Sequence, residues 1–191
     1  MGKLTRRLFT IAPIAFLVLT VSTALAADKL FINSDDAKEK DEPQKFLPDY
    51  DKLIAGSNAD WVYFPKGGLK SYKTAMVEDF EDNGRSRDAR DAAREGKDYA
   101  EQWLEREGFK IVEKGADLVI TGNVFNAWEP TGAARYWGGW AANPGVGMEL
   151  LIKDSSGAVV GEMRQKAKGS TIRDAVENGL EDMVKAMMKG K

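Results

Sequence analysis

The spacing of hydrophobic residues changes along this chain, and the change limits the folds that it can adopt. Apolar and polar side chains alternate at 72–80, 146–153 and 158–167, a period of two that is typical of strands. At 86–107 and 171–189 apolar residues recur every three or four positions, which is the period of an amphipathic helix. Because such strands and helices each bury one face, the pattern predicts helices packed on a sheet.

Three further segments extend the predicted sheet. Aromatic and β-branched residues at 61–64 predict an edge strand, and 109–112 predicts a short one. The strongest strand signal lies at 116–128, where Gly122 permits a bulge or a close approach of another group. The turn at 154–157 joins the two strands that flank it into a hairpin.

Each predicted helix has an apolar face and a signal at one end. The first ends at Gly108, and its face changes from small residues, which permit close packing on a sheet, to Trp103 and Leu104. The second begins at Thr171, which resembles the start of a capping box with Asp174 in place of the usual Glu. The predicted faces consist of Ala89, Ala92, Ala93, Gly96, Tyr99, Ala100, Trp103 and Leu104 in the first helix, and of Ile172, Ala175, Val176, Leu180, Met183, Val184 and Met187 in the second.

The predicted order of elements is β-β-α-β-β-β-β-α. It favours an α+β fold, in which a mixed, mostly antiparallel sheet carries two amphipathic helices packed on one face. Neither an internal repeat nor a second domain is visible in the pattern, so residues 46–191 are expected to form a single domain.

Residues 1–26 have the order of a secretory signal peptide. Basic residues precede an apolar run at 8–21, and Ala24 and Ala26 provide the small residues of a cleavage site. The alternative is an uncleaved membrane anchor, but Pro13 interrupts the run, which is shorter than the ~20 residues that span a bilayer. We therefore expect cleavage after Ala26 and export to the periplasm of a Gram-negative cell.

The exported chain is acidic. Removing three of the 28 basic residues and none of the 30 acidic ones leaves a net charge of −5. This charge gives no general attraction to nucleic acid or anionic lipid. Residues 27–45 are polar and predict a solvated tail. Without a cysteine at the cleavage point the chain cannot carry the acyl group of a lipoprotein, so any membrane association is expected to be peripheral, through protein contacts.

The sequence contains neither histidine nor cysteine. It therefore lacks the nucleophile–base pairs that need imidazole or thiolate, and every zinc or transition-metal site built on those ligands. We expect no catalytic residue, metal or cofactor. Carboxylates remain, and because many glycosidases need only two of them, a carboxylate-dependent hydrolase acting on cell-wall glycan is the alternative.

An acidic cluster at 79–84 partly matches a calcium loop. Asp79, Glu81 and Asn83 have the spacing of oxygen ligands, and Gly84 follows them. The closing position should be Glu but is Arg90. The favoured interpretation is a solvated strand end whose acidic residues precede a helix N-terminus.

The segment 128–145 is the most distinctive part of the chain, because tryptophans, a tyrosine and an arginine alternate with glycines. These residue types are frequent among the hot spots of protein interfaces, so the segment predicts a contact surface for an envelope protein or a cell-wall component. In the alternative, the tryptophans cap an exposed edge of the core. The candidate binding residues of this aromatic loop are Trp128, Arg135, Tyr136, Trp137 and Trp140.

Several segments resemble a family of bacterial envelope proteins, mostly lipoproteins, catalogued as domain-of-unknown-function family thirty-three thirteen. The similarity lies in 46–53, 61–64, 69–73, 116–122 and 135–139, and in the hairpin segment 151–160. The same segments are similar to envelope domains akin to the periplasmic domain of the curli-secretion channel lipoprotein. The resemblance implies an α/β sandwich-like domain without known catalytic residues, and this chain departs from it by lacking the lipidation cysteine. With the missing histidine and cysteine, it favours a non-enzymatic binding or assembly module.

Overall fold

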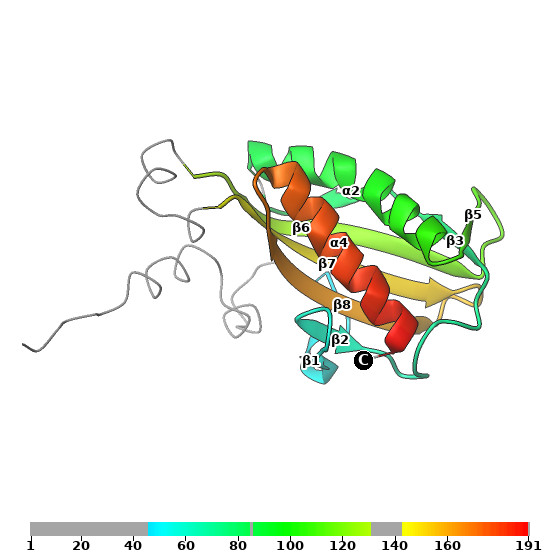
Figure 1. Ribbon diagram of the computed structural model, residues 1–191. Helices are drawn as coiled ribbons and strands as arrows, with labels where there is room; N and C mark the ends of the chain where they lie inside the picture. Colours follow the sequence, from blue (N-terminus) through cyan, green and yellow to red (C-terminus); the bar gives the residue numbers. More distant parts are fainter. Residues whose placement is uncertain (1–45, 85, 131–142, 191) are drawn as a thin grey trace, which may run out of the picture.

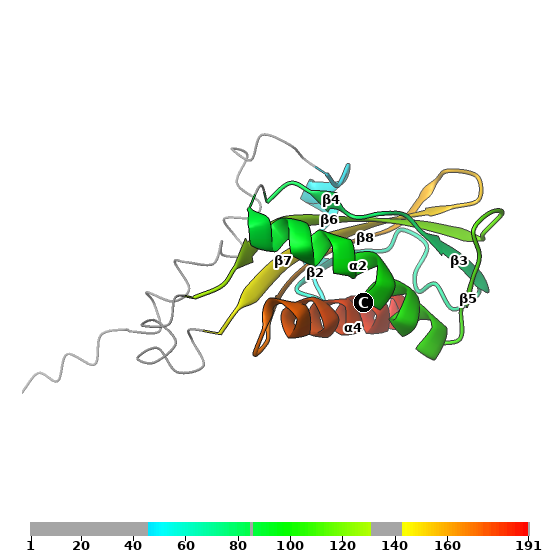
Figure 2. The ribbon, with the colours of Figure 1, turned by 90° about the horizontal axis from the view of Figure 1, so that it is seen from above.

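The computed structural model describes residues 46–84, 86–130 and 143–190. These residues form two layers, with an eight-stranded mixed sheet on one side and the helices α2 (Arg87–Arg106) and α4 (Ile172–Lys189) on the other (Figures 1 and 2). The predicted α+β fold with both helices on one face is therefore confirmed. No helix in the described ranges is long and apolar enough to cross a membrane.

The centre of the sheet is a long antiparallel meander. It consists of β6 (Leu118–Trp128), β7 (Gly145–Asp154) and β8 (Val159–Lys168), paired in sequence order. The predicted hairpin at 154–157 is confirmed. β2 (Trp61–Tyr63) adds to β8 and β1 (Ile54–Ala55) adds to β2, both antiparallel.

The other side of the sheet is parallel. β3 (Thr74–Val77) lies between β6 and β5 (Lys110–Ile111) and runs parallel to both. The short β4 (Glu81–Asp82) also pairs with β6 in parallel, beyond the end of β3. The crossover from β3 and β4 through α2 to β5 and β6 requires this direction, because the helix covers one face between strands of the same sheet.

Two details of the predicted sheet are wrong. The strand at 61–64 is not an edge, since β1 lies outside β2. The strand predicted at 72–80 covers only Thr74–Val77, and β4 follows it as a separate strand at Glu81–Asp82. β1 and β4 were missed because two residues are too few to show an alternating pattern.

The predicted helix faces form the helix side of the core between the layers. All their members are buried except Trp103 and Ile172, which are half-buried and pack against the core. The Ser86 hydroxyl accepts a hydrogen bond from the Ala89 amide and caps the N-terminus of α2. Thr171 does the same for Asp174 at 3.1 Å, which confirms the predicted cap of α4.

The ring of Phe80 lies between a glycine of α2 and a glycine of β6. A Cβ added at Gly96 or at Gly122 would lie 2.4 Å from a carbon of this ring. Gly122 therefore permits the close approach of the Phe80 ring. The bulge or irregularity in β6 lies farther along the strand, between Val124 and Asn126. The two glycines let one aromatic ring fill the space between helix and sheet.

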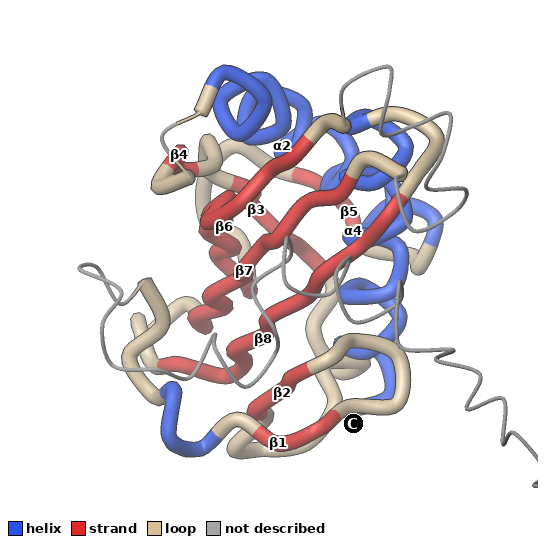
Figure 3. Tube along the Cα trace, turned by 90° about the vertical axis from the view of Figure 1, so that its left-hand side faces the viewer, coloured by secondary structure: helices blue, strands red, loops and turns tan. Residues whose placement is uncertain are grey.

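The face of the sheet away from the helices is covered in part by the chain that leads into it. We call residues 46–53, which include the short 3-10 helix η2 (Tyr50–Lys52), the strap. Leu47, Tyr50 and Leu53 of the strap form a second apolar cluster with Leu151 of β7. Figure 3 shows β7, β8 and β2 side by side, on whose outer face this cluster lies.

Candidate functional site

The aromatic loop lies mostly outside the described residues. Arg135, Tyr136, Trp137 and Trp140 fall in 131–142, so only Trp128 has a described position. Trp128 is half-buried at the end of β6, where it pairs with Gly145, the first residue of β7. The predicted loop therefore begins and ends at one end of the sheet, and the hairpin turn at 154–157 lies at the other.

A buried cluster of polar side chains lies on the sheet face that the strap covers. Glu149 of β7 and Arg164 of β8 are direct partners in the antiparallel ladder, and both are at most 2% exposed. The Arg164 guanidinium donates to the Glu149 carboxylate in an ion pair. The side-chain amide of Asn123 donates to the same carboxylate at 2.8 Å.

The strap supplies a fourth member of this network. The Tyr50 hydroxyl donates to Glu149 and accepts a hydrogen bond from Arg164 at 3.1 Å. Buried charges are tolerated when they are paired and hydrogen-bonded in this way. Tyr50 therefore binds the strap to the charged pair on the sheet.

An aromatic ring covers the arginine. The Arg164 guanidinium lies 3.7 Å from the centre of the Phe125 ring, a cation–π contact. The ring itself lies over Gly147, where an added Cβ would be 2.4 Å from it. The alternation of Gly147 and Glu149 in the sequence predicted that they share a face, but nothing in a single sequence indicated that Arg164 and Phe125 meet there.

Glu162 is a second buried carboxyl on this face. Its side chain is fully buried, and one oxygen accepts the backbone N–H of Asp49 in the strap at 3.1 Å. The other oxygen has no hydrogen-bond partner among the described residues. Burial raises the pKa of Glu162 to about 7, because the ionised form loses its hydration while the Asp49 amide compensates only in part.

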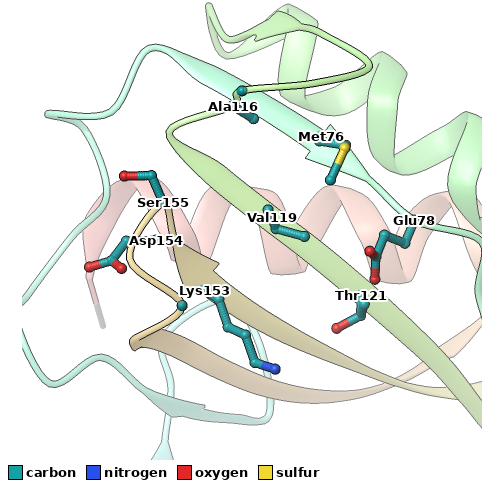
Figure 4. A pocket seen from close by; sticks show the side chains of 10 residues that line it. Met76, Glu78, Ala116, Val119, Thr121, Lys153, Asp154 and Ser155 are labelled. Carbon is teal, nitrogen blue, oxygen red and sulfur yellow. The ribbon is translucent and has the colours of Figure 1, made fainter.

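An open pocket of about 480 Å³ lies at the other end of the same face, beside the hairpin turn. Met76 and Val119 lie side by side in it, and Glu78 and Lys153 extend toward Thr121 from opposite sides (Figure 4). Asp154 at its rim accepts hydrogen bonds from the Ser156 hydroxyl and from the amides of Ser156 and Ala158. These bonds, of which the one from the Ser156 hydroxyl has the largest effect, hold the pKa of Asp154 below its usual value. This carboxylate therefore stabilises the hairpin turn.

The acidic cluster at 79–84 is engaged in contacts within the chain. Asp79 forms an ion pair with Lys97 at 3.1 Å, and Asp82 forms one with Arg90 at 3.8 Å. In the part of the chain that the structure describes, no group of three or more acidic side chains is arranged to hold a metal ion. Arg90, which stands where a calcium loop needs a closing Glu, forms an ion pair with Asp82 of the same cluster.

The chain is similar in fold to the PelC dodecamer from Paraburkholderia phytofirmans. The identity is 19% over 68% of this chain and 96% of that chain, with a TM-score of 0.52. Two looser neighbours also match. A DUF330 protein from Xanthomonas campestris is 12% identical over 61% of this chain and 84% of that chain, with a TM-score of 0.33. A DUF4136 family protein from Bacteroides thetaiotaomicron is 13% identical over 73% of this chain and 99% of that chain, with a TM-score of 0.35. At these identities the similarity to PelC concerns the fold alone.

No family model matches the chain, and no curated protein matches it significantly. The resemblance to family thirty-three thirteen and to the curli channel lipoprotein therefore stays a prediction.

Proposed function

We propose that this protein is a non-enzymatic binding or assembly module of the Gram-negative cell envelope, exported to the periplasm by cleavage after Ala26. The observation that carries the proposal is the fold, which this chain shares with PelC over nearly all of that protein. The PelC structure is a dodecamer, so this arrangement of sheet and helices is compatible with building a large assembly. The signal-like N-terminus and the resemblance to envelope proteins support the location.

The aromatic loop is the proposed contact surface. Trp128, Arg135, Tyr136, Trp137 and Trp140 bring large apolar area and a positive charge to one segment, and such side chains dominate the binding energy of many interfaces. The partner is an envelope protein, a cell-wall component or a further copy of this chain. The loop joins β6, the longest strand of the sheet, to β7, so the β6–β7 ladder anchors both its ends.

A double substitution, Trp137→Ala with Trp140→Ala, tests this surface. We expect capture of cross-linked periplasmic partners to be lost while the melting temperature stays near that of the unaltered protein. A matched control is Ile54→Ala, which removes an exposed apolar side chain from the edge strand β1 and should leave capture intact. Full capture by a stable double variant would exclude the loop, and a large loss of stability would favour the alternative in which the tryptophans cap the core.

The second candidate, a carboxylate-dependent hydrolase of cell-wall glycan, draws support from Glu162. A carboxyl with a pKa of about 7 has the property that a general acid needs near neutral pH. Its complete burial under the strap argues against access of a polysaccharide. Incubation with peptidoglycan fragments distinguishes the two candidates: turnover that disappears in Glu162→Gln would support the hydrolase and contradict the non-enzymatic module.

A further inference from the structure

The strap is attached to the sheet by two kinds of contact. Leu47 and Leu53 are buried against Leu151, and these apolar contacts do not depend on pH. The polar contacts are those of Tyr50 with the Glu149–Arg164 pair and of the Asp49 amide with Glu162. Because the strap covers both carboxyl groups, lifting it would return them to water.

The two carboxyl groups differ in the number of hydrogen bonds that they receive while the strap is docked. Glu149 receives hydrogen bonds from Arg164, Tyr50 and Asn123, so its charge is compensated. Glu162 receives one hydrogen bond, and its second oxygen is buried without a partner in the described part of the chain. An ionised carboxylate in such a place is costly, whereas the neutral acid is much less so.

The charges around Glu162 do not remove this cost. Asp49 of the strap and Glu149 of β7 are acidic and disfavour its ionised form, while Lys52 of the strap favours it. On the same face Arg164 is already paired with Glu149, and Tyr63 lies opposite Glu162 in the β2–β8 ladder.

We propose that the strap is a pH-sensitive cover of the β7–β8 face, which docks most firmly when Glu162 is protonated. Deprotonation weakens the docking and favours release of the strap. Release exposes the apolar side chains of Trp61, Tyr63 and Leu151 beside the Glu149–Arg164 pair, a surface that combines apolar area with charges. The cover goes beyond the proposed assembly role and does not depend on it.

The sign follows from the pKa of Glu162 in the two states. With the strap docked the pKa is about 7, and in water it is 4.5. Docking is therefore unaffected by this group below the lower value, weakens as the pH rises between the two, and reaches its minimum above the higher one. Between about pH 5 and about pH 8 these two values correspond to an about 70-fold fall in the docking equilibrium constant.

Hydrogen exchange of backbone amides in the mature chain tests the proposal. The direct reporter is the amide of Asp49, which donates to Glu162 across the contact between the strap and the sheet. After correction for the intrinsic exchange rate, we expect its protection to fall by up to about 70-fold between about pH 5 and about pH 8. The amides of Lys52 and Leu53 donate within the strap and report on its own turn. Amides in the β7–β8 ladder should keep their protection over the same range.

Two variants make the test specific. Glu162→Gln keeps an oxygen acceptor for the Asp49 amide without a charge, and it should remove the pH dependence of strap protection. Glu113→Gln, at an exposed site, should retain it. Equal pH dependence in wild type and Glu162→Gln would overturn the proposal, as would a parallel loss of protection in the β7–β8 ladder.

A direct titration decides the matter if Glu162→Gln does not fold. The ¹³C shift of the Glu162 carboxyl in the unaltered protein should report a midpoint near 7. A midpoint near 4.5, the value in water, would overturn the proposal.

Discussion

At the residue scale, this sheet differs from one with an apolar face and a solvent-exposed polar face, because its second face buries the charged pair Glu149–Arg164. The two side chains are direct ladder partners, so the ion pair forms only when β7 and β8 have their observed register. A slip by one residue would turn one of the two charges into the apolar helix-facing core. The pair therefore specifies register, a role attested for buried polar groups elsewhere.

Removing one charge of this pair should cost more than removing both. We expect Arg164→Met alone to lower the free energy of unfolding by about 3–5 kcal/mol, because Glu149 is left buried without its partner. The double variant Arg164→Met with Glu149→Leu should recover part of that loss. Urea denaturation of the unaltered protein and the two variants measures this difference, and a double variant that is no more stable than Arg164→Met would contradict the account.

Two neighbouring residues of α2 provide a matched pair for the helix face. Leu104 is fully buried, so Leu104→Ala should cost about 2–5 kcal/mol. Trp103 is half-buried and stacks with the guanidinium of Arg106 at 4.3 Å, so Trp103→Ala should cost less despite the larger side chain. Thermal denaturation ranks the two, and the reverse order would mean that the face of α2 is wrongly assigned.

At the element scale, the long periodic segments and the short apolar strands β2 and β5 were predictable, whereas β1 and β4 were not. The bounds of α2 and α4 lie within a residue of the predicted helices, because each helix has a capping hydroxyl and a complete apolar face. The two-residue strands β1 and β4 depend on pairing with β2 and β6, and their own residues carry no pattern. The Glu149–Arg164–Tyr50 network was missed for a similar reason: its members come from three separate segments that only the folded sheet brings together.

The contact between α2 and β6 is tight enough to test by adding a single methyl group. Gly122→Ala places a Cβ 2.4 Å from the ring of Phe80, so the ring or the strand must move. Overpacking of this kind costs about 1–3 kcal/mol. Combining Gly122→Ala with Phe80→Leu should cost less than the sum of the two single changes in urea denaturation, and simple additivity would show that the clash is relieved elsewhere.

At the scale of the whole molecule, the two faces of the sheet differ in what they bury. The helix face holds most of the apolar core, as its sequence pattern predicted. The opposite face holds buried charges under the strap and, near the hairpin, an open pocket. The aromatic loop joins this sheet at the end away from the pocket, so loop, strap and pocket are three distinct regions that the proposed envelope assembly could use for contacts.

Native mass spectrometry of the protein recovered from periplasmic extract after mild cross-linking tests the central claim most directly. The account predicts a chain that begins at Ala27 and is found in a complex with further copies of itself, with an envelope protein or with a cell-wall component. A chain that retains Met1, or one that is found only as a monomer, would contradict the account.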